Sequence, residues 1–319
     1  MPNYILSIDQ GTSSCRALLV NMEGQIEKIC QSEFTQYFPE PGQVEHDASE
    51  IWATQLKVIK ELFEDSSYDP SDVLSIGITN QRETCLLWNK ESGKPLGRAI
   101  VWQDRRTAPF CDHLKQEEKA DFIKEKTGLV IDAYFSGSKI RWMLDHYPEA
   151  RALAAEGKLC AGTIDSWLIY KLTGGNHYTD PSNASRTMLF NIDSGTWDDE
   201  LLDLFDIPKS ILPEVLDTDG DFGSIKDEYL GCSIPIQSAI GDQQAALFGQ
   251  LCLEKGMAKN TYGTGCFMLM NTGDQRVQSP TGLLSTIAWK LSGQSMKYAL
   301  EGSVFIAGAA IQWCAMGLN

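Results

Sequence analysis

The first segment whose residue types could do chemistry is Asp9–Ser14, which reads Asp-Gln-Gly-Thr-Ser-Ser. A carboxylate ends an apolar stretch here, and a small turn rich in hydroxyl groups follows it. Glycine lets backbone N–H groups approach an anion closely, and the hydroxyls of Thr12, Ser13 and Ser14 can donate hydrogen bonds to phosphate oxygens. Taken alone, the segment favours an ordinary tight turn.

A second turn of glycine and threonine, Tyr262-Gly263-Thr264-Gly265, repeats this pattern. Both turns lie between short stretches with strand character, in residues 4–21 and 258–271. We interpret them as an internal repeat, in which two facing hairpins hold a nucleoside triphosphate between two domains. No Gly-x-x-x-x-Gly-Lys-Ser/Thr run is present, which excludes a P-loop, and no Gly-x-Gly-x-x-Gly run supports a Rossmann dinucleotide site.

Two further segments place charged side chains at the ends of expected strands. They read Asn80-Gln81-Arg82-Glu83 and Gly241-Asp242-Gln243-Gln244. Arginine offers a planar fork of donors and glutamate accepts hydroxyl protons, which suits a polyhydroxy substrate. The alternative for Arg82 and Glu83 is a surface ion pair. Asp242 could cap a helix, or it could be the general base for a hydroxyl nucleophile.

The elements around these segments predict an α/β protein. Tyr4–Asp9, Arg16–Asn21 and Gln25–Phe34 have strand character with tight turns between them, which favours an antiparallel meander. Helical spacing follows an expected capping box at Asp47, and Val73–Thr79 predicts the next strand. Three strands, a helix and a strand in this order are typical of the start of a ribonuclease-H-like or actin-like ATPase fold.

Later segments extend this pattern into a second domain. The strand, turn and strand over residues 258–271 begin the second copy of the hairpin. We therefore expect a complete amino-terminal domain over residues 1–250 and the start of a similar domain over 251–319. Further strands are expected at 84–89, 99–102 and 234–241, and helices at 107–127, 139–146, 164–172 and from Asp242.

The composition argues against several classes of partner. The 319 residues are 43% hydrophobic and 22% charged, which is typical of globular domains, and the length favours two of them. With 27 basic and 43 acidic residues the formal net charge is -16, and such a surface repels nucleic acid and anionic membranes. The nine cysteines lack Cys-x-x-Cys spacing, which favours a reducing, cytoplasmic location. No apolar run approaches the ~20 residues that span a bilayer.

Several longer runs resemble the FGGY family of carbohydrate kinases and, within that family, the glycerol kinases. The resemblance extends from Tyr4 to about Trp313 and includes a run similar to an FGGY signature at Tyr134–Trp142. The runs are long and specific, so they point beyond the superfamily. The matching runs are Asp9–Ser14, Pro41–Asp47, Gly77–Thr84, Ala99–Gln103, Tyr134–Trp142, Asn183–Ile192, Gly241–Gln250 and Asn260–Phe267.

The resemblance implies a transferase that moves a phosphoryl group from ATP to glycerol and forms sn-glycerol 3-phosphate. Asp242 would take the proton from the terminal hydroxyl, and ion pairing with Arg82 or Mg²⁺ should keep it ionised at neutral pH. Mg²⁺ would bridge the phosphates near Asp9 and Asp242, largely through water. The implied glycerol site is Arg82, Glu83, Trp102, Tyr134, Asp242, Gln243 and Phe267. The implied ATP site is Thr12, Ser13, Ser14, Arg16, Thr264, Gly308 and Gln312.

The sequence departs from the resembled family at its end. Family members continue through most of a second domain, with a glycine-rich segment for the adenosine, whereas this sequence stops at Asn319. Cys314–Asn319 also differs from the charged helix that the family has there. We therefore expect a C-terminally truncated kinase, from a frameshifted, fragmentary or shortened gene, with weak or absent activity. For full-length members the resemblance implies a homo-oligomer.

Three alternatives to a glycerol kinase stay open. A kinase for a larger polyol or ketose would share the fold, but Trp102 and Phe267 argue against it because they narrow the pocket. A catalytically impaired fragment would bind glycerol or a partner subunit without using ATP. A chaperone or filament protein with an actin-like fold is supported by the hairpins alone.

Overall fold

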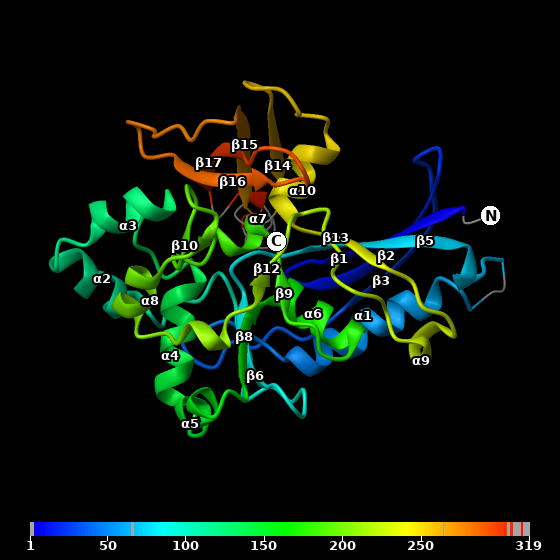
Figure 1. The fold of residues 1–319 in the computed structure, drawn as a ribbon, viewed down its shortest axis with the longest axis horizontal. Coiled ribbons are helices and arrows are strands. Elements are labelled where there is room, and N and C mark those ends of the chain that lie inside the picture. Colours follow the sequence, from blue (N-terminus) through cyan, green and yellow to red (C-terminus); the bar gives the residue numbers. More distant parts are fainter. Residues whose placement is uncertain (1–2, 65–66, 264, 305–306, 309–313, 315–319) are drawn as a thin grey trace.

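The amino-terminal hairpins form a five-stranded sheet in the computed structural model, which describes all residues except 1–2, 65–66, 264, 305–306, 309–313 and 315–319. The strand order is β13-β5-β1-β2-β3 (Figure 1). β1, β2 and β3 are antiparallel neighbours, whereas β5 and β13 run parallel to β1. This order confirms the predicted ribonuclease-H-like, actin-like ATPase fold. The strands are β1 (Tyr4–Gln10), β2 (Ser14–Asn21), β3 (Ile26–Glu33), β5 (Val73–Asn80) and β13 (Ile236–Gly241).

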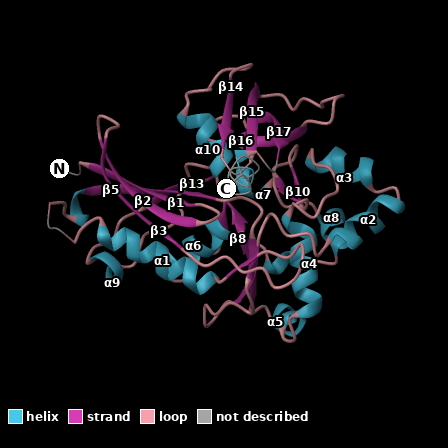
Figure 2. Ribbon diagram, turned by 180° about the vertical axis from the view of Figure 1, so that it is seen from behind, coloured by secondary structure: helices cyan, strands magenta, loops and turns pink. Residues whose placement is uncertain are grey.

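Two helices, α1 (Ala48–Glu61) and α6 (Ile164–Thr173), cover one face of this sheet (Figure 2). Alternate residues of β1 and β2 are buried against them, as expected for strands with one face in a core. Asp47 caps α1 by accepting hydrogen bonds from the backbone N–H groups of Ser49 and Glu50. Glu50 does not complete the predicted capping box, because its carboxylate accepts from Thr35 instead.

A second core surrounds a four-stranded sheet in the order β4-β7-β6-β8, with helices packed around it. The helical stretch predicted around 107–127 is present as two helices. Glu118 between them has a left-handed φ of 57°, which interrupts the helical path. The elements are β4 (Glu45–His46), β6 (Cys85–Asn89), β7 (Ala99–Ile100), β8 (Leu159–Thr163), α2 (Ala108–Gln116), α3 (Ala120–Thr127), α4 (Ser136–His146), α5 (Ala150–Ala155) and α8 (Asp199–Phe205).

The last described part of the chain forms a separate antiparallel sheet in the order β14-β15-β17-β16, at the top of Figure 1. The hairpin of β14 and β15 was predicted, whereas β16 and β17 were not. This sheet is joined to the preceding part of the chain by hydrogen bonds from the Ser285 N–H to the Gly128 carbonyl and from the Tyr298 hydroxyl to the Ile192 carbonyl. A domain division at residue 250 stays a prediction. The strands are β14 (Ala258–Tyr262), β15 (Cys266–Gly273), β16 (Leu284–Trp289) and β17 (Lys297–Val304).

The remaining elements are short and connect the three larger sheets. None of the helices in the described ranges has the length and apolar character needed to cross a membrane. The connecting elements are the 3-10 turns η1 (Pro70–Asp72) and η2 (Lys209–Ile211), the strands β9 (Tyr178–Thr179), β10 (Phe190–Asn191), β11 (Thr196–Trp197) and β12 (Glu214–Val215), and the helices α7 (Pro181–Ala184), α9 (Asp227–Leu230) and α10 (Asp242–Gly249).

Three parallel strands of the first sheet end side by side, and this alignment positions the site. Asn80 at the end of β5 is in register with Gln10 of β1 and Gly241 of β13. The segments that follow these strands are therefore neighbours, although they are far apart in the sequence. Ligands of open α/β sheets bind at the carboxyl ends of such strands.

Candidate functional site

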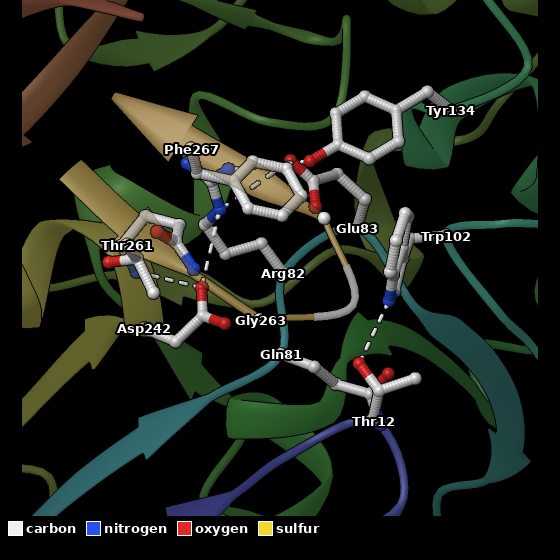
Figure 3. Close-up of a pocket in the computed structure, with 12 residues that line it drawn as sticks. Thr12, Gln81, Arg82, Glu83, Trp102, Tyr134, Asp242, Thr261, Gly263 and Phe267 are labelled. Carbon is white, nitrogen blue, oxygen red and sulfur yellow. Dashed lines mark hydrogen bonds and ion pairs between the residues drawn. The ribbon is translucent and has the colours of Figure 1, made fainter. Parts of the chain in front are cut away.

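A cavity of about 160 Å³ opens where β1, β5 and β13 end, with β14 and β15 on its other side (Figure 3). This volume is well below the roughly 300–1,000 Å³ of pockets for drug-sized ligands. The cavity therefore suits a small molecule. It is lined by Thr12, Gln81, Arg82, Glu83, Trp102, Tyr134, Asp242, Gln243, Thr261, Gly263, Gly265 and Phe267.

All seven residues predicted for the glycerol site line this one cavity, and so does Thr12 from the predicted ATP site. Their roles stay predictions. Ser13 lies exposed in the first turn, and Ser14 accepts a hydrogen bond from Gln31. The Gly308 N–H donates to the Gly263 carbonyl in the second turn at 3.0 Å. Thr264 and Gln312 fall outside the described residues.

Gln81 fixes the first turn against the end of β5. Its side-chain amide donates to the Gln10 side chain at 3.0 Å and to the Gly11 carbonyl at 3.2 Å. Its backbone N–H donates to the Gln10 carbonyl at 2.7 Å. Thr84 in turn donates to the Gln81 side-chain oxygen at 2.9 Å. These bonds hold the turn and the charged segment after β5 in one arrangement.

Asp242 begins α10 and points its carboxylate at Arg82, with Oδ1 3.5 Å from Nε (Figure 3). A glycine precedes it for a steric reason, since a Cβ on Gly241 would lie 2.9 Å from the Arg82 side chain. The Gly241 N–H also donates to Ser182 Oγ at 2.9 Å, and Ser182 donates to the buried carboxylate of Asp180. These hydrogen bonds therefore fix the backbone of the residue that precedes Asp242.

Burial raises the pKa of Asp242 to about 6, Arg82 opposes this rise, and Glu83 adds to it. The carboxyl group is therefore mostly ionised at pH 7, as expected, yet close enough to its pKa to accept a proton readily. General bases work best when their pKa lies near the operating pH. Its side chain keeps 35% exposure, so a ligand in the cavity can reach it.

The donor fork of Arg82, which the sequence suggested for a substrate, is occupied by protein. Nη1 donates to Glu301 Oε2 at 2.7 Å, and Nη2 donates to Glu301 Oε1 at 3.0 Å. Nη1 also reaches Gln244 at 3.2 Å, and Nη2 reaches the Tyr134 hydroxyl at 3.3 Å. Glu301 comes from β17, so the sheet of β14–β17 directly holds a side chain from the end of β5.

Glu83 adopts a left-handed backbone conformation, with φ at 60°, which is rare for a residue other than glycine. Ser136 donates to its carbonyl at 3.0 Å, and Arg186 Nε donates to its carboxylate at 2.6 Å. Strained residues of this kind are found mainly at functional sites, where the surroundings maintain them. Arg186 also donates to Glu301 at 2.9 Å, and it is fully buried.

Aromatic rings form the wall opposite these charges. The rings of Trp102 and Phe267 meet edge to face at 6.1 Å, and those of Trp102 and Tyr134 do so at 5.9 Å. The Trp102 indole N–H donates to Thr12 Oγ1 at 3.0 Å, which links this wall to the first turn. A carbon chain could lie on the rings while its hydroxyls face Arg82 and Asp242.

The side chain of Lys259 on β14 contacts residues that line the cavity. Its ammonium group donates to Gln243 Oε1 at 2.5 Å and to Thr261 Oγ1 at 2.9 Å. Burial and, to a lesser extent, the nearby Arg82 lower the pKa of Lys259 to about 8. Because the amide oxygen of Gln243 faces the ammonium group, its amide nitrogen is left to donate elsewhere.

The residues predicted to lie near a metal fit the needs of Mg²⁺. This ion keeps several waters and takes one or two carboxylates together with phosphate oxygens. Asp9 and Asp242 supply such carboxylates, although Asp9 pairs with Arg16 at 3.2 Å. Burial raises the pKa of Asp9 and Arg16 opposes the rise. Within the described part of the chain, no three His, Cys, Asp or Glu side chains form a protein-only metal cluster.

Sequence reasoning missed three charged residues of the site, which are Arg186, Lys259 and Glu301. Glu301 directly follows the apolar residues Tyr298, Ala299 and Leu300, which are buried in β17, and a charged residue next to such a stretch is a usable signal. Arg186 lies in a matched run, but nothing in its local pattern indicates that it is buried. Lys259 alternates with exposed residues on β14, which hides its inward direction.

Comparison with known proteins identifies the family of this chain. The model of the FGGY family of carbohydrate kinases, N-terminal domain, matches residues 4–249. The glycerol kinase of Deinococcus radiodurans is 56% identical over 318 residues, with 99% of this chain and 63% of that protein covered. The glycerol kinase of Nitratidesulfovibrio vulgaris is 57% identical over 320 residues, with 100% of this chain and 64% of that protein covered. The chain thus spans somewhat under two thirds of the length of these curated relatives.

Solved structures agree on the fold. A glycerol kinase of Plasmodium falciparum, solved with ADP, has a TM-score of 0.94 and 38% identity, and the match covers 99% of this chain and 63% of that one. A xylulose kinase of Lactobacillus acidophilus has a TM-score of 0.87 at 22% identity, with 99% of this chain and 63% of that one covered, and shows the fold alone. The family match over most of the sequence and the site at the strand ends lead to one conclusion: the chain belongs to the FGGY family of carbohydrate kinases.

Proposed function

We propose that this protein is an ATP-dependent glycerol kinase, in which the described residues supply the glycerol pocket and the catalytic base. The observation that carries the proposal is a base with a raised pKa beside a fixed arginine in a small cavity with an aromatic wall. The high identity to glycerol kinases supports the substrate. The cysteines lack Cys-x-x-Cys spacing, which suits a reducing cytoplasm, where we place the reaction.

The protein residues have distinct tasks in this proposal. Trp102 and Phe267 contact the carbon chain, while Glu83, Tyr134 and Gln243 form hydrogen bonds with its hydroxyls. Asp242 accepts the proton of the terminal hydroxyl as that oxygen bonds to the γ-phosphorus and the bond to the ADP oxygen breaks. Such a transfer depends on position and on charge neutralisation more than on covalent chemistry.

The nucleotide is proposed to lie between the two hairpin turns. Thr12, Ser13, Ser14 and Arg16 would contact its phosphates from the first turn, and Thr264 from the second. Gly308 and Gln312 would contact the nucleoside. Mg²⁺, when bound near Asp9 and Asp242, neutralises charge on the phosphates. The ADP bound to the Plasmodium falciparum relative supports a nucleotide substrate.

The first experiment is a calorimetric titration of the chain with glycerol and, separately, with a non-hydrolysable ATP analogue in the presence of Mg²⁺. The proposal expects both to bind, and expects ADP formation, which the sequence predicts to be weak, to depend on glycerol. Binding of glycerol without the nucleotide would instead support a substrate-binding protein without kinase activity. Binding of neither ligand would contradict the proposal.

A kinase for a larger polyol or ketose is the second candidate within the family. The solved xylulose kinase at 22% identity shows that the fold itself does not select the substrate. The small cavity and its aromatic wall favour glycerol. A comparison of kcat/KM for glycerol, erythritol and xylulose distinguishes a glycerol kinase from a kinase for a larger substrate. A higher kcat/KM for erythritol or xylulose would contradict the proposal of a glycerol kinase.

A further inference from the structure

The donors of Arg82 are almost fully used inside the protein. A guanidinium group has five N–H donors, two on each Nη atom and one on Nε. The four on Nη1 and Nη2 match four acceptors, two from the Glu301 carboxylate and one each from Gln244 and Tyr134. Among the described residues, no hydrogen bond is made by Nε.

The Nε donor points into the gap between two other carboxylates. It lies 3.5 Å from Asp242 Oδ1 and 3.7 Å from Glu83 Oε1, both too long for a hydrogen bond and both on the cavity wall. A ligand hydroxyl in this gap could accept from Nε and donate to one of the carboxylates. Arg82 therefore offers the cavity a single donor of fixed direction.

Glu301, in the sheet of β14–β17, determines the direction of the Arg82 Nε–H. It is fully buried on β17, an interior strand of its sheet, and a buried carboxylate is tolerated only when it is paired. Arg186 Nη2 pairs with its Oε1 atom at 2.9 Å, and Arg82 Nη1 pairs with its Oε2 atom. Burial alone would raise the pKa of Glu301, but Arg186 and Arg82 lower it to about 2, so it stays ionised.

We propose that Glu301 is a positioning residue for substrate selection, which occupies the Arg82 fork so that only its Nε–H serves the substrate. The inference rests on the proposed function and deepens it. A site built to hydrogen-bond one hydroxyl rejects an analogue that lacks it, because buried polar groups are then left unpaired. Without Glu301, the two Nη atoms of Arg82 can turn towards the cavity. Selection for the substrate hydroxyl that binds the Nε–H is then lost.

The test compares the affinities for glycerol and for 1,2- and 1,3-propanediol, each of which lacks one of its hydroxyls. Dissociation constants are measured by titration of the unaltered chain, Glu301→Gln, Glu301→Asp and the control Asp165→Asn. Asp165 is a buried carboxylate outside the cavity, so its variant reports the effect of losing a buried charge. Circular dichroism verifies that each variant is folded.

We expect Glu301→Gln to reduce the preference for glycerol over at least one diol by about tenfold or more, with Glu301→Asp in between. Asp165→Asn should keep the preference of the unaltered chain. A uniform loss of affinity for all three ligands would show a merely structural role and overturn the inference. If the unaltered chain binds no glycerol, the proposed function fails and the inference fails with it. If it binds and Glu301→Gln keeps the full preference, only the inference fails.

A second measurement needs no Glu301 variant to fold. In the unaltered chain with ¹⁵N-labelled arginine, the Nε–H signal of Arg82 is assigned by its loss in Arg82→Lys. Glycerol should shift this signal, while that of Arg186, whose Nε is bonded to Glu83, should move less. An Arg82 Nε–H signal that glycerol leaves unchanged would overturn the inference.

Discussion

Arg82 Nε and Asp242 Oδ1 lie 3.5 Å apart, although the two residues are 160 positions apart in the sequence (242 − 82). Their strands β5 and β13 are parallel neighbours that end in register, so both side chains reach the same cavity. The pairing with Arg82 opposes the rise in the pKa of this partly buried carboxylate, which stays mostly ionised at neutral pH. A group that must accept a proton from a hydroxyl is thereby available for the proposed reaction.

The first prediction concerns the pH dependence of catalysis. Burial raises the pKa of Asp242 to about 6, and only the ionised form can accept a proton. We expect kcat/KM for glycerol to be constant near pH 7 and to fall tenfold per pH unit well below pH 6. The measurement is a rate profile between pH 5 and 8 at saturating Mg²⁺ and ATP. A kcat/KM that stays constant down to pH 5, as expected for a carboxyl group with an ordinary pKa near 4, would contradict this assignment.

The same raised pKa predicts a sign for stability. The folded protein holds the Asp242 proton more tightly than the unfolded chain does, so this group favours folding most at acidic pH. Its contribution is fully present below the ordinary value of 3.8 and is lost as pH rises through about 6. Asp242→Asn should therefore increase the free energy of unfolding at pH 7 relative to pH 4, measured by urea denaturation at both values. An equal change at the two values would contradict it.

The buried charge network predicts a large stability effect at Arg186. Its guanidinium pairs with Glu83 and Glu301, and all three side chains are buried. Arg186→Met leaves these carboxylates with only Arg82, and breaking a buried pair in this way costs about 3–5 kcal/mol. Urea denaturation measures the loss. Lys209→Met, which removes an exposed pair with Asp199, serves as the control and should change stability by about 1 kcal/mol or less.

The aromatic wall predicts which substitution relaxes substrate choice. Trp102 lies between Tyr134 and Phe267, and its indole also bonds Thr12. Trp102→Ala enlarges the cavity and should lower kcat/KM for glycerol more than for erythritol. The ratio of the two values should fall by about 10-fold or more, because a missing contact of this size costs about 1–3 kcal/mol. Trp142→Ala, outside the cavity, should leave the ratio unchanged.

How far the sequence predicts this site depends on the range of the interactions. Arg82 and Asp242 could be placed because each follows a strand, and parallel strands bring their ends together. Thr12 could be placed because it stands in a turn directly after β1. The split of the helix at Glu118 could not be predicted, since a single left-handed residue leaves helical spacing on both sides intact.

The charge network lay beyond local patterns for a different reason. Glu301 and Arg82 are 219 residues apart and come from different sheets. Their pairing depends on how the sheet of β14–β17 meets the first, which no spacing rule encodes. For an arginine without a partner, it is reasonable to expect that its planar donors face the substrate. In this protein those donors bind Glu301 of β17 instead.

The central claim is that Asp242 is the base that activates glycerol, and one substitution tests it directly. Asp242→Asn keeps the size of the side chain and removes its ability to accept the proton. The glycerol-dependent kcat, measured as ADP release, should fall by about 10²–10⁴-fold, whereas the dissociation constant of glycerol should change less than tenfold. A kcat within twofold of that of the unaltered protein would contradict the account.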